Sequence, residues 1–324
     1  MNKTRIVFFG TPKFSEIVLQ KLFESVSLSR DVQDGFEIVG VVTALDKIVG
    51  RKKVLTPPLV KVLAQEKGVP VFQPQKLNEE FVEQLKSLEL DLCVVASYGK
   101  IIPQAVLDIP RRGNINVHPS LLPKYRGPSP IQWALLNGDD KTGVTIMLMD
   151  EKMDHGATIN SKQLTINKDE KFSELHDRLA HLGAELLVES IPKYLSGEIK
   201  AQEQKHEQAT FCKMIKKEDG KIDWSLSAEE IYNLWRAFEE WPGVYSKQGA
   251  INNKQGMNIK FIEIKNVGTG LDLSYKKPGE FFTQDKKLYV ACGDNTALEI
   301  LKLQPEGKKA MDAQAFINGY LKKD

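Results

Sequence analysis

The sequence predicts an α/β fold in two parts. The first is a Rossmann-like, mostly parallel sheet with flanking helices, and the second is a small antiparallel β-barrel that resembles an OB fold. Three observations lead to this prediction: apolar, β-branched runs alternate with helical patterns through the first half, polar and apolar residues alternate at period two in the last third, and 324 residues exceed what one hydrophobic core usually serves.

In the first half, short apolar runs that predict strands alternate with segments of helical spacing. The predicted strands cover residues 5–10, 36–43, 69–73 and 90–99, and the predicted helices cover 14–23, 58–68 and 79–89. The run "LCVVAS" is apolar on both faces, which is typical of a buried parallel strand. Ligands of such sheets bind beyond the carboxyl ends of the strands. The first strand ends in "FFGTPKF", with one glycine where a dinucleotide fingerprint needs three, which argues against NAD or FAD.

The second half begins with a long predicted helix over residues 171–197, with a kink at Pro192 and a stop at Gly197. The segment after it lacks apolar periodicity and predicts a linker. We therefore predict a catalytic domain over 1–200, a linker over 201–213 and a C-terminal domain over 214–324. In the last domain, period-two alternation predicts strands over 257–267, 279–293 and 296–304, and helical spacing predicts helices over 227–238 and 312–321.

Composition excludes several classes of protein. The formal net charge of +2 neither demands nor excludes a polyanionic partner. Cys93, Cys212 and Cys292 lie far apart in the sequence, so we expect neither a disulfide framework nor a structural zinc site. No apolar stretch approaches the roughly 18 residues of a membrane span, and the N-terminus does not resemble a signal peptide. We expect a cytoplasmic monomer without membrane contact.

Polar residues near the middle of the chain suggest a reactive site. In "INVH", Asn116 and His118 point to one face of a strand and Val117 points to the other. The segment "EKMDHG" carries Asp154 in a loop that we expect at the same sheet edge. An amide donor, an imidazole and a carboxylate at one point suit acyl transfer to an amine, because Asn116 can stabilise an oxyanion and His118, oriented by Asp154, can move a proton.

Each of these residues also has a structural interpretation. A lone Asn often ends a strand or forms a turn, a lone His is often a satisfied structural residue, and Asp two positions before Gly is a common turn. His176 and His181 are five residues apart and miss the i, i+4 spacing of helical metal ligands. The sequence therefore predicts no metal site.

Five motifs carry a resemblance to a known family. "FFGTPKF", "SYGKIIP", "INVHPSLLPKYRGPSPIQWALLNGD", "TGVTIMLMDEKMDHG" and "IDWSLSAEEIYNLWRAFEEWPGVYS" occur in this order over nearly the whole chain. Together they resemble the 10-formyltetrahydrofolate-dependent formyltransferases, and within them the family that formylates methionyl initiator tRNA.

The resemblance implies roles for particular residues. The family's catalytic Asn, His and Asp fall on Asn116, His118 and Asp154. The expected folate contacts are listed here in chain order: Ile101, Ile102, Ser120, Leu121, Leu122, Pro123 and Asp150. The implied co-substrate is 10-formyltetrahydrofolate and no metal is needed.

The amine substrate is the open question at this stage. The basic loop "GRKK" resembles the family's insertion for the tRNA acceptor stem, which implies tRNA contacts by Arg51, Lys52 and Lys53. Charge alone favours a solvated basic turn over a binding loop, but the resemblance over the rest of the chain favours tRNA as the substrate. Related enzymes formylate a ribonucleotide or amino-sugar nucleotides, and one hydrolyses the folate. A non-enzymatic tRNA-binding module is a further alternative, although it would be expected to lose part of the Asn, His and Asp set.

Overall fold

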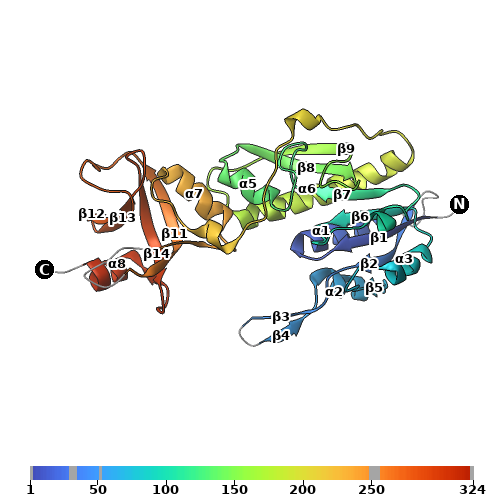
Figure 1. The fold of residues 1–324 in the computed structure, drawn as a ribbon, viewed down its shortest axis with the longest axis horizontal. Coiled ribbons are helices and arrows are strands. Elements are labelled where there is room, and N and C mark those ends of the chain that lie inside the picture. The colour runs from blue at the N-terminus through green and yellow to red at the C-terminus, as the bar shows by residue number, and fades with distance from the viewer. Residues whose placement is uncertain (1–2, 29–34, 51–52, 248–255, 322–324) are drawn as a thin grey trace. The chain divides into compact units, whose positions relative to one another are not determined.

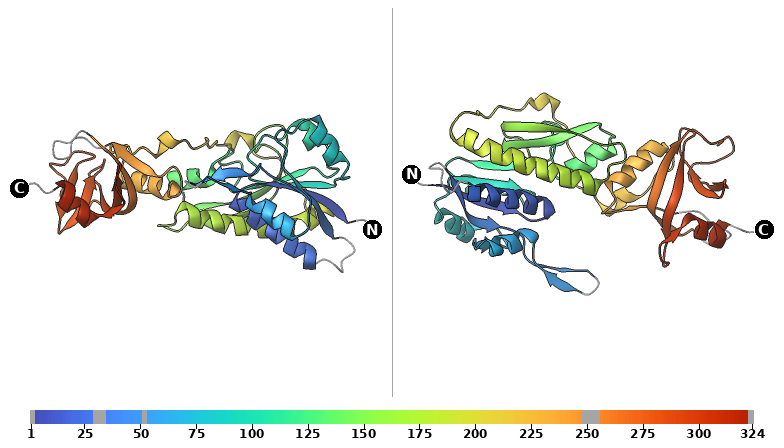
Figure 2. Two further views of the ribbon diagram at one scale, coloured as in Figure 1. Left: turned by 90° about the horizontal axis from the view of Figure 1, so that it is seen from below. Right: turned by 180° about the vertical axis from the view of Figure 1, so that it is seen from behind.

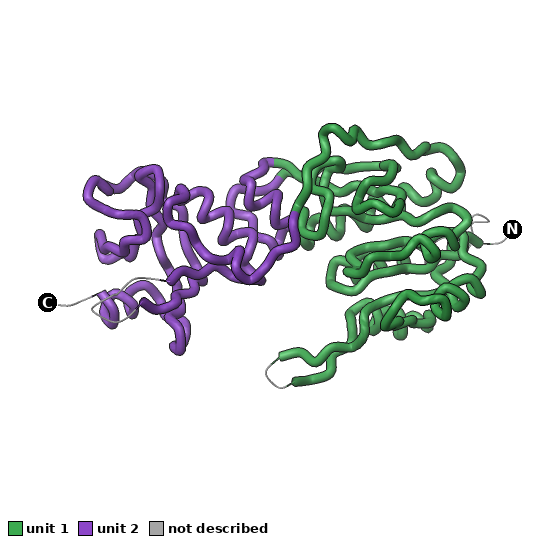
Figure 3. Tube along the Cα trace, in the orientation of Figure 1, with its two compact units in different colours: residues 1–130, 141–165, 176–212 green, residues 131–140, 166–175, 213–324 purple. Residues whose placement is uncertain are grey.

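The computed structural model describes residues 3–28, 35–50, 53–247 and 256–321. The chain divides into two compact units, coloured in Figure 3: unit 1 comprises 1–130, 141–165 and 176–212, and unit 2 comprises 131–140, 166–175 and 213–324. The residues of the predicted linker up to 212 thus contact unit 1. The predicted division into 1–200, 201–213 and 214–324 stays a prediction.

Unit 1 is built on a seven-stranded sheet with the order β5-β2-β1-β6-β7-β8-β9 (Figure 1). The first five strands of this order pair in parallel, and β8 and β9 add antiparallel pairs. This confirms the mostly parallel sheet. Its strands are β1 (Thr4–Gly10), β2 (Phe36–Val42), β5 (Val71–Phe72), β6 (Leu92–Ala96), β7 (Asn114–His118), β8 (Lys141–Leu148) and β9 (Thr158–Thr165).

Helices cover both faces of this sheet. The helices of the chain's first two thirds are α1 (Lys13–Leu28), α2 (Leu59–Glu66), α3 (Glu79–Lys86), α4 (Gln104–Leu107), α5 (Pro130–Leu136) and α6 (Phe172–Leu195). One apolar cluster joins α3 and α4 to side chains of β1 and β6. On the opposite face, α1 and α6 lie side by side, as the view from behind shows (Figure 2). Each fully buried aliphatic or aromatic side chain in such a core contributes about 1.5–3 kcal/mol.

Unit 2 contains a six-stranded antiparallel sheet with the order β10-β11-β14-β13-β12, and β15 pairs with β14. Its strands are β10 (Val244–Lys247), β11 (Asn258–Gly268), β12 (Phe281–Gln284), β13 (Lys287–Ala291), β14 (Ala297–Pro305) and β15 (Met311–Asp312). The predicted antiparallel β domain is confirmed. Short 3₁₀ turns cover His206–Gln208 of unit 1 and Lys217–Gly220 of unit 2. No helix in the described part of the chain is both long and apolar enough to cross a membrane.

The helices of unit 2 begin where the sequence indicates. Ser227 and Glu230 form a capping box at α7 (Ala228–Ala237), and Asp312 caps α8 (Ala313–Phe316), which continues as a π-helical turn over Ile317–Leu321. The buried Arg236 donates to the carbonyl of Glu170 at 3.1 Å, which fastens the segment 166–175 within this unit.

The three cysteines are buried and free, as packing residues are expected to be. Burial raises the pKa of the thiols to about 12 for Cys93, about 11 for Cys212 and about 12 for Cys292, above the ordinary value of 9.0. A thiol whose pKa is raised by folding stabilises the folded state fully below the unfolded pKa, and this contribution is lost as the pH rises through the folded pKa. We therefore expect the free energy of unfolding to fall between about pH 9 and about pH 12.

The same burial makes a prediction about thiol reactivity. We expect iodoacetamide to label all three cysteines slowly in the folded protein at about pH 8 and rapidly once urea unfolds the chain, because only an exposed thiolate reacts. Mass spectrometry of the labelled protein measures this. Rapid labelling of Cys93 before unfolding would contradict its burial, and Cys93→Ala serves as the control for assigning that label.

Candidate functional site

The strand β7 presents its polar residues on one face. Asn116 pairs with Val95 of β6, which belongs to the apolar cluster under α3 and α4, so Asn116 and His118 lie on that face of the sheet. Val117 faces the other way and packs against α6, where a Cβ added to Gly183 would lie 2.8 Å from Val117 Cγ1. Alternation along β7 therefore places the amide and the imidazole side by side.

Asp154 reaches these two residues from the loop 149–157 between β8 and β9. Because β8 runs antiparallel to β7, its last residue Leu148 pairs with Ile115 near the start of β7. The loop therefore leaves the sheet at the end of β7 opposite to His118, and not at the shared edge that the sequence suggests. It folds back so that Asp154 Oδ1 lies 3.6 Å from His118 Nδ1 and 3.5 Å from Asn116 Nδ2.

Backbone conformation fixes the direction of the Asp154 side chain. Asp154 has a φ of 49°, in the left-handed region that Asp tolerates better than most residues. Its second oxygen, Oδ2, accepts a 2.7 Å hydrogen bond from the backbone N–H of Gly127. Two residues on, Gly156 has no room for a side chain, since a Cβ would lie 2.1 Å from the carbonyl oxygen of Leu148. The position of the carboxylate is thus fixed both by the backbone conformation of Asp154 and by the hydrogen bond that its Oδ2 accepts.

His118 is 4% exposed and both of its ring nitrogens face polar groups. Nε2 lies 3.0 Å from the carbonyl oxygen of Tyr125, which can only accept, so Nε2 carries the hydrogen. Nδ1 faces Asp154 at 3.6 Å. This geometry turns Nε2 toward a backbone acceptor and Nδ1 toward the carboxylate.

The segment Ser120–Pro123 follows β7 directly. Ser120 is fully buried and its hydroxyl donates to the carbonyl of Lys124 at 2.5 Å. The hydroxyl of Thr145 donates to the carbonyl of Ser120 at 2.7 Å and accepts from the N–H of Leu122 at 3.1 Å. These bonds define the path of the loop, so Ser120 supports its shape, while Leu121 and Leu122 remain partly exposed.

The other expected folate contacts differ in exposure. Ile101 is 87% exposed, whereas Ile102 is 8% exposed and belongs to the apolar cluster of α3 and α4. Asp150 lies in the loop of Asp154, where its Oδ2 is 2.7 Å from Nδ1 of His155 and its Oδ1 accepts from the N–H of Lys152 at 2.9 Å. Ile101 is therefore the residue of this group that offers free apolar surface.

The basic loop is the turn of a small hairpin formed by β3 (Lys47–Val49) and β4 (Val54–Thr56). Lys53 is exposed, has a φ of 51° and donates its N–H to the carbonyl of Gly50 at 3.1 Å. Arg51 and Lys52 lie outside the described residues. The strands of the hairpin were missed by the sequence analysis because three residues each are too short for a period-two pattern. Their side chains are exposed: Ile48 is 67% and Leu55 is 62% accessible to solvent.

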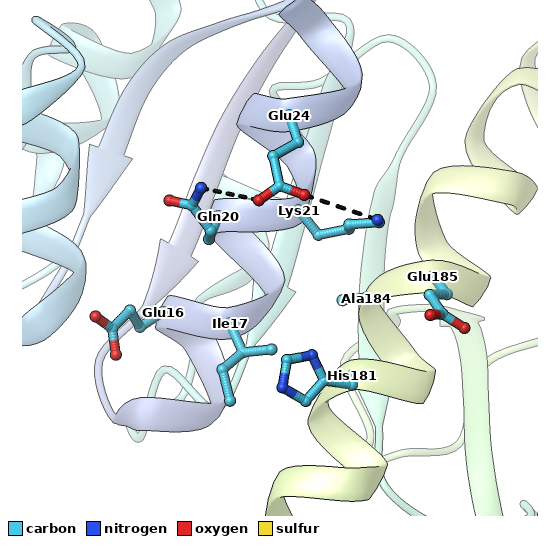
Figure 4. A pocket seen from close by; sticks show the side chains of 8 residues that line it. All are labelled: Glu16, Ile17, Gln20, Lys21, Glu24, His181, Ala184 and Glu185. Atoms are coloured by element: carbon cyan, nitrogen blue, oxygen red, sulfur yellow. Dashed lines mark hydrogen bonds and ion pairs between the residues drawn. The ribbon is translucent and has the colours of Figure 1, made fainter. Parts of the chain in front are cut away.

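A separate groove lies between α1 and α6, on the face of the sheet opposite to Asn116 and His118 (Figure 4). It has a volume of about 370 Å³ and contains none of the expected site residues. Its lining includes Ile17 and Ala184 together with polar and charged side chains such as Lys21. Within the described ranges, no group of three His, Cys, Asp or Glu side chains could hold a metal ion.

Some contacts of the site carry little signal in the sequence. Tyr125 and Gly127 act through a backbone carbonyl and a backbone N–H, which any residue type offers. At position 127 the residue type itself is informative. Only glycine fits there, because φ is 125° and a Cβ would lie 2.3 Å from the carbonyl oxygen of Cys212. Gln204, which contacts the loop of Asp154, was hidden in the predicted linker.

Comparison with known proteins agrees with the geometry. The family model "Formyl transferase" matches residues 4–191, and "Formyl transferase, C-terminal domain" matches residues 214–321. A methionyl-tRNA formyltransferase of Bacillus velezensis is 43% identical over 98% of this chain and 95% of the relative, and that of Listeria innocua is 40% identical over 98% and 96%.

Solved structures show the same fold at low identity. The N-formyltransferase of Helicobacter canadensis, in complex with folinic acid and dTDP-3-aminofucose, aligns with a TM-score of 0.65 at 18% identity over 93% of this chain and 99% of that one. HypX of Aquifex aeolicus, in complex with tetrahydrofolic acid, aligns with a TM-score of 0.60 at 16% identity. The alignment covers 98% of this chain and 48% of that one. On the strength of the two family models and of relatives that are 40–43% identical over nearly its full length, the chain belongs to the methionyl-tRNA formyltransferase family.

Proposed function

We propose that this protein transfers the formyl group of 10-formyltetrahydrofolate to the α-amino group of methionyl initiator tRNA, with Asn116, His118 and Asp154 as its catalytic residues. The observation that carries the proposal is that these three side chains meet on one face of the sheet. Asp154 Oδ1 lies 3.6 Å from His118 Nδ1 and 3.5 Å from Asn116 Nδ2. The family membership of the chain supports the reaction, and the geometry supports the assignment of roles.

The reaction needs no covalent enzyme intermediate, because the amine is itself the nucleophile. The amine nitrogen bonds to the formyl carbon and the carbonyl oxygen becomes negative. Collapse then breaks the bond between the formyl carbon and N10 of the folate. The α-amino group loses one proton and N10 gains one, so the proton balance closes. An α-amino group with a pKa of about 7.7–8.0 is neutral in roughly one molecule in ten at pH 7, so the neutral nucleophile is available without a strong base.

We assign oxyanion stabilisation to Asn116. Its amide nitrogen carries two hydrogens, and one of them points at Asp154 Oδ1 over a long 3.5 Å contact. The second hydrogen is available for the developing negative charge. A single well-placed donor of this kind typically contributes a factor of about 10²–10³ in turnover.

We assign proton transfer to His118 through Nδ1, since Nε2–H is engaged by the Tyr125 carbonyl. A proton received by Nδ1 lies beside the carboxylate of Asp154, and the opposite charges attract. Asp154 is therefore assigned the role of orienting the imidazole. His118 takes the proton from the attacking amine and returns it to N10 as that bond breaks.

The two substrates are proposed to use different parts of unit 1. Ile101, the partly exposed leucines of Ser120–Pro123 and the Asp150 loop are proposed to wall the flat pterin, for which apolar surface with few polar groups is suited. Ile102 supports Ile101 from the core. The hairpin tip with Arg51, Lys52 and Lys53 is proposed to bind the acceptor end of the tRNA by phosphate contacts.

Incubation with 10-formyltetrahydrofolate and charged initiator tRNA tests the function. We expect formyl-methionine on the tRNA, with stoichiometric tetrahydrofolate. Formate release without any amine would favour the hydrolase alternative, and turnover only with an amino-sugar nucleotide or a ribonucleotide would favour those relatives. Binding of both ligands without any product would support the non-enzymatic module.

A further inference from the structure

The segment 202–212 is fastened to the loops of the candidate site at both ends. At one end, the N–H and C=O of Gln202 pair with those of Thr158 in β9, both at 2.8 Å. At the other end, Arg126 donates its N–H to the carbonyl of Thr210 at 2.9 Å and accepts from the N–H of Cys212 at 2.8 Å. The segment therefore runs from β9 to the loop that carries Gly127 and Tyr125.

Between these ends lies Gln204, which is 6% exposed. Its Nε2 donates to the carbonyl of Asp154 at 3.0 Å and to that of Gly156 at 2.7 Å. Its Oε1 accepts from Nε of Arg126 at 3.1 Å and from Nη2 of Arg126 at 2.7 Å. Both hydrogens and both lone pairs of the amide are used. If the amide were turned over, its NH2 group would face the donors of Arg126 and its oxygen would face the loop carbonyls, so the orientation is fixed.

The loop that Gln204 holds is one that needs support. Asp154 sits at a positive φ of 49°, a backbone conformation that residues with a Cβ rarely adopt. Gly156 is pressed against the backbone of Leu148. Gln204 bonds the carbonyls on both sides of His155, so it fixes the backbone from which the Asp154 carboxylate projects.

A second link joins the same elements. Arg126 is 4% exposed, and its Nη2 lies 2.8 Å from Nδ1 of His206. Since a guanidinium only donates, Nδ1 of His206 accepts this bond. The ring of His206 stacks on that of His155, with centroids 4.1 Å apart and planes 5° apart, and His155 in turn contacts Asp150. Arg126 thus connects to the loop both through Gln204 and through the stacked rings.

We infer that Gln204 is a positioning residue for the formyl transfer: held by Arg126, it fixes the backbone around Asp154 so that the carboxylate stays against His118 and Asn116. This inference rests on the proposed role of Asp154. Gln204 touches neither the reacting atoms nor the three catalytic side chains, so it acts through the loop alone.

The test is a double-mutant cycle with Gln204→Glu and Asp154→Ala. Gln204→Glu keeps the size and the Arg126 contact but replaces the amide nitrogen, which donates both hydrogen bonds to the loop, by an oxygen that repels the loop carbonyls. We expect kcat to fall about tenfold or more, because a displacement of about 1 Å at a reacting group has effects of this size, while KM for both substrates changes less than about threefold. In the Asp154→Ala background the same change should lower kcat by less than about twofold.

The matched control is Gln202→Glu, the same substitution on an exposed side chain whose backbone alone makes contacts. We expect it to keep the wild-type kcat. A normal kcat for Gln204→Glu beside an impaired Asp154→Ala would overturn the positioning role alone. Effects that multiply in the double variant would overturn it as well. A wild-type rate for Asp154→Ala would instead overturn the proposed role of Asp154.

Hydrogen exchange gives a readout besides activity. In Gln204→Glu we expect faster exchange in peptides covering 125–129 and 149–157, because the Gly127 N–H bond to Asp154 loosens. Faster exchange across the whole sheet would mean a folding defect and would overturn the local explanation. If Gln204→Glu does not fold, Gln204→Met replaces it in the double-mutant cycle, because methionine has a similar length and no charge.

Discussion

Replacing His118, Asn116 or Asp154 by alanine is expected to lower kcat for formyl transfer by at least about a hundredfold while the protein stays folded. His118→Ala removes the proposed proton carrier, Asn116→Ala the proposed oxyanion donor and Asp154→Ala the carboxylate that is proposed to orient the imidazole. Steady-state kinetics with charged tRNA measure the loss, and circular dichroism checks the fold.

The three losses should not multiply, because the residues manage charge at one centre. A double variant such as Asn116→Ala with Asp154→Ala is expected to be about as slow as the slower single variant. Losses equal to the product of the single effects would contradict a common centre. His181→Ala, a histidine on α6 in the groove of the opposite face, is the matched control and should keep the wild-type rate.

Replacing Arg51, Lys52 and Lys53 together by alanine is expected to lower kcat/KM for charged tRNA by about a hundredfold, since the variant loses three positive charges that are proposed to contact phosphates. The Kd of the folate should change little, because its proposed contacts lie outside the hairpin. The slope of tRNA affinity against salt concentration should also shrink, as fewer counterions are released.

Lys193→Ala provides a control for lost charge, since Lys193 is an exposed lysine on α6 paired with Glu189. We expect it to bind tRNA normally. Equal loss of folate and tRNA affinity in the hairpin variant would indicate a folding defect. An unchanged kcat/KM for charged tRNA would support the alternative interpretation, in which the loop is a solvated basic turn.

Predictions from local sequence patterns agreed with the structure where interactions between residues close in sequence determine the element. The apolar runs of β1 and β6 are buried on both faces, and the Ser227 capping box begins α7 as its sequence indicates. Strands of three residues, as in β3 and β4, escape such an analysis, because too few positions alternate to define a face.

The predicted linker shows a different limit. Residues 201–213 lack apolar periodicity because they form neither a regular helix nor a strand. Residues 201–212 nevertheless belong to unit 1, and several of them, such as Gln202, Gln204 and Thr210, form hydrogen bonds with the rest of it. Gln204 lies 50 residues from Asp154 and 78 from Arg126 along the chain. Bonds over such separations leave no local pattern, so the absence of periodicity predicts an irregular segment and not a free one.

From the sequence alone come the α/β class, the shared face of Asn116 and His118, and the motifs of the formyltransferases, since burial and the period of a strand act between near neighbours. The tertiary structure alone decides that β8 runs antiparallel to β7, that Nε2 of His118 faces the Tyr125 carbonyl, and that Gln204 and Gly127 form hydrogen bonds with Asp154. These depend on backbone groups and long-range hydrogen bonds, whose partners are chosen by the path of the whole chain and not by the residues beside them.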